Sequence, residues 1–168
     1  MVRDLRHADI PAVISVFRAS VRISARHDYT HEQAVAWAPD EIDVAAWAKR
    51  YDTRRGWVAE ADAGLARASS PETGLEIVGF IELEGSSHLD MLYVHPAHQR
   101  RGLAGALLRA LESAARDRGA ERLYTEASIT ARPFFERRGF LLVAQQTVAV
   151  RGQQFINFRM EKPLADPA

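Results

Sequence analysis

The 168-residue sequence contains no cysteine, which excludes disulfides, thiolate metal sites and cysteine nucleophiles together. It also lacks an excess of either charge, since Lys plus Arg and Asp plus Glu both number 22. A nucleic-acid-binding domain usually carries a basic surplus, so we expect no nucleic-acid partner. No apolar run approaches the roughly 18 residues of a membrane span, and the N-terminus has no secretory hydrophobic region. We therefore expect no membrane partner and a cytoplasmic protein.

Length and composition favour one globular domain over residues 1–165. Apolar residues make up 47% of the chain, which is ordinary for a domain that buries a substantial core. The sequence has no internal repeat and no linker-like segment. Its histidines do not form a metal-ligand spacing, so we expect no metal site.

The apolar periodicity and the turn residues predict a mixed α/β protein. Helices are predicted over Asp9–Ile23, Thr30–Trp37, Asp40–Tyr51 and Ala131–Arg138. One more helix is predicted to follow a glycine loop, described in the next paragraph, and to end near Arg118. Strands are predicted over Val2–Arg6, Trp57–Glu60, Leu75–Leu83, Ser87–Val94, Arg122–Ala127, Phe140–Val150 and Gln153–Glu161. The small and polar residues of 61–74 predict a long, mobile hairpin loop. The pattern indicates a twisted mixed sheet of about six or seven strands with helices on both faces.

The most informative segment is a basic glycine loop between an apolar strand and a helix. The strand ends in Leu92-Tyr93-Val94-His95-Pro96, and the loop and first helical turn read Gln99-Arg100-Arg101-Gly102-Leu103-Ala104-Gly105. About four N–H groups at a helix N-terminus lack intrahelical partners and lie at the positive end of the helix dipole. Small residues leave these groups accessible to a phosphate. The segment therefore predicts a pyrophosphate site, although a tight turn that only needs small residues would look similar.

Two motifs together carry a family resemblance. The loop resembles the Gln/Arg-x-x-Gly-x-Gly/Ala motif of the GNAT superfamily of acyl-CoA-dependent N-acetyltransferases. Downstream, Ala131-x-x-Phe134-Phe135-Glu136-Arg137-Arg138-Gly139-Phe140 resembles the second motif of that family. The resemblance covers nearly the whole chain, is strongest over residues 88–140, and implies a GNAT-like fold, acetyl-CoA as the cosubstrate and an amine acceptor.

By this resemblance, the amides of Arg101, Gly102, Ala104 and Gly105 hold the pyrophosphate and Gln99 flanks them. Backbone groups of Leu92 and Val94 pair with the pantetheine arm as an added strand would. The complete set of expected cofactor-binding residues is Leu92, Tyr93, Val94, Gln99, Arg100, Arg101, Gly102, Leu103, Ala104, Gly105, Ser128 and Phe135.

Amine acetylation needs a neutral amine, so a general base near pH 7 helps. His88 and Asp90 are the candidates: strand alternation places both on one face, and an adjacent carboxylate would raise the histidine pKa. A solvated polar strand end is the competing interpretation. Glu82 is a weaker candidate and is expected at the surface.

Phe134, Phe140 and Trp57 are expected in the core.

The general acid is where the sequence departs from the family. The tyrosine that usually protonates the thiolate is matched by Phe135, and a common asparagine is matched by Ser128. Ser128, Tyr124 or a water could replace the acid, or the thiolate could leave unassisted, since a thiol has a pKa of about 8.5.

For the acceptor pocket, the resemblance points to the segment between the first two helices, with His27, Tyr29 and Trp37 as candidates. A surface or packing role for these residues stays open. The acceptor class and the oligomeric state are also open; a homodimer is one expectation that the resemblance adds. The alternative function is an acyl-CoA-binding sensor without turnover. A nucleotide-binding switch is disfavoured, because the loop lacks a Gly-Lys-Ser/Thr ending.

Overall fold

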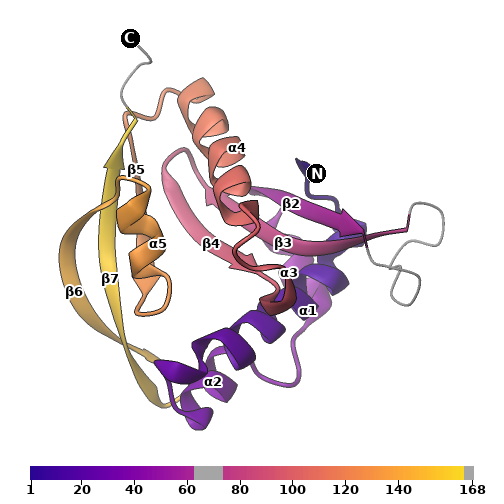
Figure 1. The fold of residues 1–168 in the computed structure, drawn as a ribbon, viewed down its shortest axis with the longest axis vertical. Coiled ribbons are helices and arrows are strands. Elements are labelled where there is room, and N and C mark those ends of the chain that lie inside the picture. The colour runs from indigo at the N-terminus through magenta and orange to yellow at the C-terminus, as the bar shows by residue number, and fades with distance from the viewer. Residues whose placement is uncertain (63–73, 165–168) are drawn as a thin grey trace.

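The computed structural model describes residues 1–62 and 74–164, and these form one seven-stranded mixed sheet with helices packed on it (Figure 1). The strand order is β1-β2-β3-β4-β5-β7-β6, and every neighbouring pair is antiparallel except β4 and β5. The strands are β1 Val2–Asp4, β2 Arg54–Asp62, β3 Leu75–Glu84, β4 His88–Val94, β5 Arg122–Ser128, β6 Leu141–Val150 and β7 Gln153–Pro163. The predicted mixed α/β class and strand number are confirmed. The loop predicted over 61–74 lies mostly outside the described residues, since β2 extends to Asp62 and β3 begins at Leu75.

The helices cover both faces of the sheet, as predicted. They are α1 Ile10–Ala19, α2 His31–Trp37, α3 Val44–Arg50, α4 Leu103–Asp117 and α5 Arg132–Arg137. Neighbouring residues of β2 point to opposite faces: Trp57 and Ala59 pack in the core under α4, whereas Val58 packs with α1. The core under α4 also contains Phe140. Figure 1 shows α4 and α5 on the face nearest the viewer. Among the described residues, no helix is both long and apolar enough to span a membrane.

Local sequence signals set most helix ends. Thr30 Oγ1 accepts from the Gln33 N–H and the Gln33 side chain accepts from the Thr30 N–H, which is the capping box that the sequence predicts at α2. The carboxylate of Asp43 caps α3, so this helix begins four residues later than predicted, at Val44. The first helix ends at Ala19 rather than Ile23, because Ser20–Ser24 forms a π-helix.

The sheet opens between β4 and β5. Among the described residues, these parallel strands pair at a single position, His88 opposite Tyr124, and then diverge. Figure 1 shows the result as two half-sheets, β1 to β4 and β5 to β7, with α4 packed on the first of them. The fold therefore leaves one side of β4 without a strand neighbour along most of its length.

A β-bulge interrupts β4 next to this opening. Glu82 of β3 lies opposite Met91, and Leu83 lies opposite Leu89, so Asp90 is the extra residue on β4. A bulge bends its strand and re-aims the side chains beside it. Strict alternation between His88 and Asp90, on which the sequence prediction relied, does not describe this part of the strand.

Candidate active site

The free side of β4 presents backbone groups to the opening. Val94 lies opposite Gly79, and the His95 N–H donates to the Val78 carbonyl 2.7 Å away. In an antiparallel pair this hydrogen bond marks Val94 as a residue whose own N–H and C=O point away from β3. Leu92 faces the same way by alternation. Tyr93 faces β3 instead, so its backbone, which was expected to bind the cofactor, is not available to the opening.

The carbonyl of Val94 is already occupied. It accepts hydrogen bonds from Ser20 Oγ at 2.8 Å and from Gln99 Nε2 at 3.3 Å. Gln99 Nε2 also donates to Ser24 Oγ at 2.7 Å, so this side chain ties the glycine loop to the π-helix after α1. The backbone groups that a ligand strand can meet are therefore the Val94 N–H and both groups of Leu92.

The opening leads to the N-terminus of α4, where the glycine loop ends. Gly102 is the N-cap residue and has a φ of +80°, and the first helical hydrogen bond runs from Ala106 N to Gly102 O. A Cβ added at Gly102 would meet no atom within 4 Å, so the space in front of the first N–H groups is open. Leu103, the first helical residue, packs its side chain on the core. This geometry fits a phosphate group held by main-chain nitrogens.

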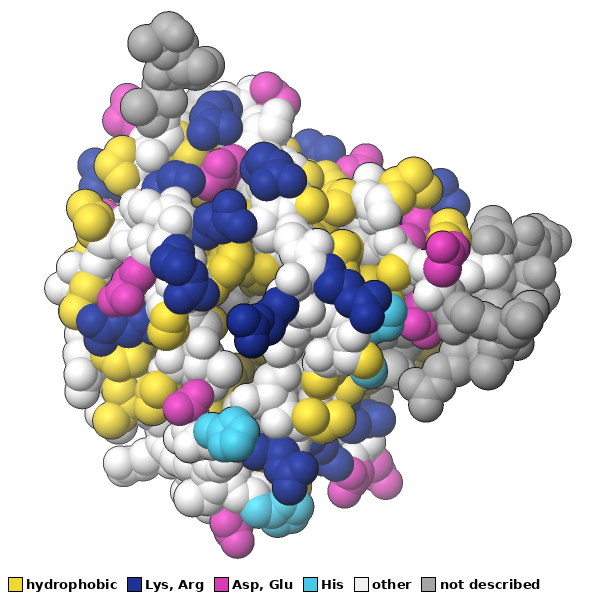
Figure 2. Space-filling view, viewed as in Figure 1, with side chains coloured by type: hydrophobic (Ala, Val, Ile, Leu, Met, Phe, Trp, Pro, Cys, Tyr) yellow, Lys and Arg dark blue, Asp and Glu magenta, His cyan; other side chains and the backbone are white. Residues whose placement is uncertain are grey.

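Arginines surround this helix terminus. Arg100, which has a left-handed backbone with a φ of +61°, and Arg101 are exposed in the loop. The Arg138 guanidinium packs against Gly105, where an added Cβ would lie 2.5 Å from it. Figure 2 shows Lys and Arg side chains gathered across the face that carries α4 and α5. The positive charge complements the phosphates of a nucleotide-bearing ligand.

Glu82 lies at the other end of the opening, and the prediction that it is a surface residue is wrong. Its side chain is fully buried and its Oε1 is bound by Arg50 at 2.8 Å and by Arg54. The same two arginines bind Asp90 Oδ2 at 2.8 and 2.5 Å. Burial is tolerated because each carboxylate is paired with guanidinium groups. The cluster fixes the position of Asp90 on the bulge.

His88 lies between two carboxylates. Its Nδ1 is 2.7 Å from Glu84 and its Nε2 is 2.7 Å from Glu126, whereas Asp90 is 3.9 Å away. Burial alone would lower the His88 pKa, but hydrogen bonds with Glu84 and Glu126 and the surrounding negative charge raise that pKa overall. An imidazolium donates from both nitrogens, which matches this geometry. The positive ring holds the carboxylates in place, so His88 in this form is not a general base.

The raised pKa predicts a pH-dependent contribution to stability. The free energy gained by binding a proton at His88 is fully present below the unfolded-state pKa of about 6.5. It is lost as the pH rises through the higher pKa of the folded state. The difference in unfolding free energy between the natural protein and His88→Gln, measured by urea denaturation, should therefore be larger at about pH 6 than at pH 9. A difference that grows with pH would contradict this assignment.

Tyr124 and Ser128 are the two candidate donors of the thiolate proton, and they and Phe135 lie in different surroundings. Tyr124 stacks on His88 with ring centroids 4.5 Å apart, below the opening. Ser128 lines the opening, and its Oγ accepts from the Ala131 N–H. Phe135 is 3% exposed and packs on Phe134 and Phe140. Phe134, expected in the core, is only partly buried.

A pocket of about 240 Å³ adjoins the opening, and we call it the acceptor pocket. It is lined by Tyr29, Trp37, Asp90, Met91, Tyr93, Glu126, Ser128, Val148, Val150, Phe155, Ile156 and Asn157. The structure thus brings Tyr29 and Trp37 together with Asp90 in one pocket. His27 is exposed and does not line this pocket, so its expected place there is not found.

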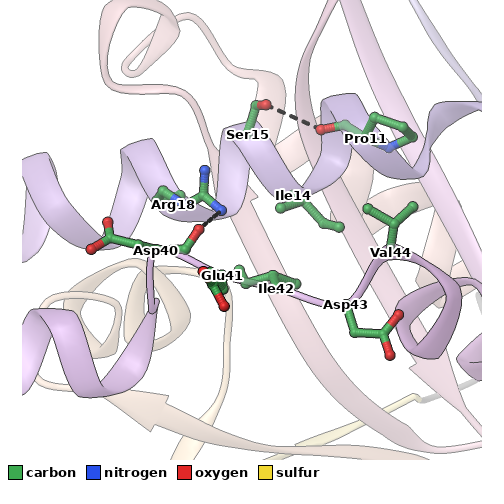
Figure 3. Close-up of a pocket in the computed structure, with 9 residues that line it drawn as sticks. All are labelled: Pro11, Ile14, Ser15, Arg18, Asp40, Glu41, Ile42, Asp43 and Val44. Carbon is green, nitrogen blue, oxygen red and sulfur yellow. Dashed lines mark hydrogen bonds between the residues drawn. The ribbon is translucent and has the colours of Figure 1, made fainter.

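A second pocket, about 690 Å³, lies between α1 and the segment that leads into α3 (Figure 3). Three of the polar side chains that line it are already bonded within the protein. Arg18 donates to the Asp40 carbonyl at 2.8 Å, Ser15 donates to the Pro11 carbonyl at 3.1 Å, and Asp43 caps α3. This pocket contains none of the residues that the opening brings together.

The geometry agrees with comparisons to known proteins. The family described as Acetyltransferase (GNAT) domain matches residues 25–162. The chain is a GNAT acetyltransferase. It is 36% identical over 159 residues to the uncharacterized N-acetyltransferase YafP of Escherichia coli K12, covering 95% of this chain and 93% of that protein.

Solved structures show the same relationship. The crystal structure of a GCN5-related N-acetyltransferase from Rhodopseudomonas palustris is 33% identical with a TM-score of 0.85, covering 97% of this chain and 94% of that one. The PaiA N-acetyltransferase of Thermoplasma acidophilum, solved with coenzyme A, shares the fold at 19% identity with a TM-score of 0.74, covering 97% and 98%.

Several residues of the acetyltransferase site were missed from the sequence. Arg50 and Arg54 hold Asp90, Glu126 holds His88, and Phe155 and Asn157 line the acceptor pocket. Asn157 is opposite Ser128 in the β5–β7 register, so its place follows from strand pairing. No local motif marks these positions.

Proposed function

We propose that the acetyltransferase binds acetyl-CoA along the free side of β4 and transfers the acetyl group to a primary amine in the acceptor pocket. The orientation of Leu92 and Val94 toward the opening carries this proposal. These residues offer backbone groups to the pantetheine amides. Beyond Val94, β4 leads to the exposed N–H groups that follow Gly102 at the start of α4. The acceptor pocket lies at the opposite end, beside Asp90.

In the reaction, the amine nitrogen forms a bond to the acetyl carbon and the carbon–sulfur bond breaks. An ammonium must lose a proton before it attacks. Asp90 and Glu126 are the carboxylates that line the acceptor pocket, and we assign them the removal of this proton through water. His88 acts as a positioning residue because its ring nitrogens contact Glu84 and Glu126.

The departing thiolate takes up a proton at the end of the reaction. Phe135 has no proton to donate. Ser128 has a hydroxyl that lines the opening, and a thiol pKa of about 8.5 allows the thiolate to leave without strong acid assistance. We therefore assign this step to Ser128 or to solvent.

Asp90→Asn tests the proposal against the alternative of an acyl-CoA sensor. The amide keeps the shape of the side chain but removes its charge, so kcat/KM for amine acetylation should fall about 100-fold. The affinity for acetyl-CoA, measured by calorimetry, should stay unchanged. Thiol release with a panel of amines is the activity readout. Saturable acetyl-CoA binding by the natural protein without thiol release on any amine would favour the sensor.

We further propose that the enzyme is cytoplasmic and draws on coenzyme A thioesters there, and that it forms a homodimer through β6. This edge strand has no charged residue over 141–150, and Leu141 and Val143 are 67% and 54% exposed. An exposed apolar edge strand favours pairing with another chain. Val143→Lys should give a monomer by analytical ultracentrifugation, whereas Ile23→Lys, at an exposed apolar position elsewhere, should not. A natural protein that is monomeric would overturn this assembly.

A further inference from the structure

The acceptor pocket has two chemically different ends. Tyr29, Trp37, Tyr93 and Phe155 form what we call the aromatic wall. Trp37 lies 5.3 Å from Tyr29, 5.9 Å from Phe155 and 6.4 Å from Tyr93 between ring centroids. These rings come from α2, β4, β7 and the segment before α2, so they are held by four different parts of the chain. The wall offers an apolar, aromatic surface to a ligand.

The opposite end of the pocket is acidic. Asp90 and Glu126 line it, and Lys, Arg and His are absent from the lining among the described residues. The wider cluster contains four carboxylates, on Glu82, Glu84, Asp90 and Glu126, against three cationic groups, on Arg50, Arg54 and His88. It therefore keeps a net negative charge even when His88 is protonated. Such a site attracts an ammonium and repels a carboxylate.

Asn157 adds a third observation. Its Oδ1 is buried and has no hydrogen-bond partner among the described residues, and the side chain lines the pocket. A buried acceptor atom without a partner is costly, so a ligand that brings an N–H donor gains by meeting it. An ammonium group carries such donors.

The size of the pocket limits the acceptor. Its volume of about 240 Å³ is below the roughly 300–1,000 Å³ of pockets that enclose drug-sized ligands. A small molecule with one ring fits this space better than an extended peptide segment.

We infer that the acceptor is a small arylalkylamine or similar ring-bearing primary amine without a carboxylate. This inference rests on the proposed function and deepens it. The aromatic wall packs on the ring, while the acidic end and Asn157 Oδ1 receive the ammonium. The neutral amine that forms there after proton loss attacks the acetyl group.

The experiment compares kcat/KM for five amines. Phenethylamine and phenylalanine differ by the carboxylate, and phenethylamine and propylamine differ chiefly by the ring. Spermidine and a lysine-containing peptide represent polycationic and macromolecular acceptors. Phenethylamine should exceed propylamine about tenfold or more through ring burial, and should exceed phenylalanine at least tenfold through charge repulsion.

Two variants test the assignment of residues. Phe155→Leu keeps an apolar side chain but removes one ring, so the phenethylamine-to-propylamine ratio should fall severalfold. A ratio is independent of the fraction of folded protein. Asn157→Leu should lower kcat/KM for all accepted amines. Ile23→Ala, at an exposed position outside the pocket, should leave both quantities unchanged.

Each outcome separates the two proposals. Preference for phenylalanine, spermidine or the peptide would overturn the acceptor class and leave acetyl transfer intact. An unchanged ratio in Phe155→Leu would overturn the role of the aromatic wall. Quenching of tryptophan fluorescence by phenethylamine in the natural protein, absent in Trp37→Phe, reports binding without turnover. No quenching and no acetylation of any amine, with acetyl-CoA still bound, would overturn both proposals.

Discussion

Gly102→Val should weaken acetyl-CoA binding by at least about 100-fold, equivalent to about 3 kcal/mol of binding free energy. Valine disfavours the φ of +80° at this position, and its branched side chain would occupy the open space in front of the first helical N–H groups. The dissociation constant measured by calorimetry checks the prediction.

Gly119→Val is the matched control for this variant. Gly119 lies after the other end of α4, has a φ of +75°, and also has no atom within 4 Å of an added Cβ. The backbone strain is thus similar, but the position is distant from the glycine loop. We expect both variants to lose stability and only Gly102→Val to lose affinity. Equal affinities would remove the N-terminus of α4 from the cosubstrate site.

Glu82→Gln should lower the unfolding free energy by about 3 kcal/mol, because Arg50 and Arg54 lose the buried carboxylate that both of them contact. Glu82 is fully buried and contacts both Arg50 and Arg54. Glu136→Gln is the control, since Glu136 forms an exposed pair with Arg132 within α5 and should change stability by less than about 0.5 kcal/mol. Urea denaturation of both variants measures the difference. A neutral Glu82→Gln would show that the cluster does not stabilise the fold.

What could be predicted from the sequence was encoded locally. The strand, glycine loop and helix around Gly102 are contiguous, so their order alone places main-chain nitrogens beside a strand end. The capping box at Thr30 and Gln33 likewise lies within four residues. These signals predicted the starts of α2 and α4 without knowledge of tertiary structure, and they are the basis of the proposed phosphate site.

The rest depends on contacts between distant segments. Glu82 was expected at the surface because a glutamate usually is, and its two arginine partners lie 28 and 32 residues away. The bulge at Asp90 comes from the pairing with β3, and Asn157 reaches the pocket through its pairing with Ser128. Neither pairing can be deduced from periodicity, which reports only alternation within one strand.

The single rung between His88 and Tyr124 has a mechanical consequence. Among the described residues, the backbones of the two half-sheets pair at this one position, and the half-sheets also share an apolar core. A bound pantetheine chain would add backbone hydrogen bonds along β4. Cosubstrate concentration should then govern the durability of the enzyme as well as its rate, since a ligand that binds only the folded state raises the melting temperature. When acetyl-CoA is scarce, the folded protein would therefore be at its least stable.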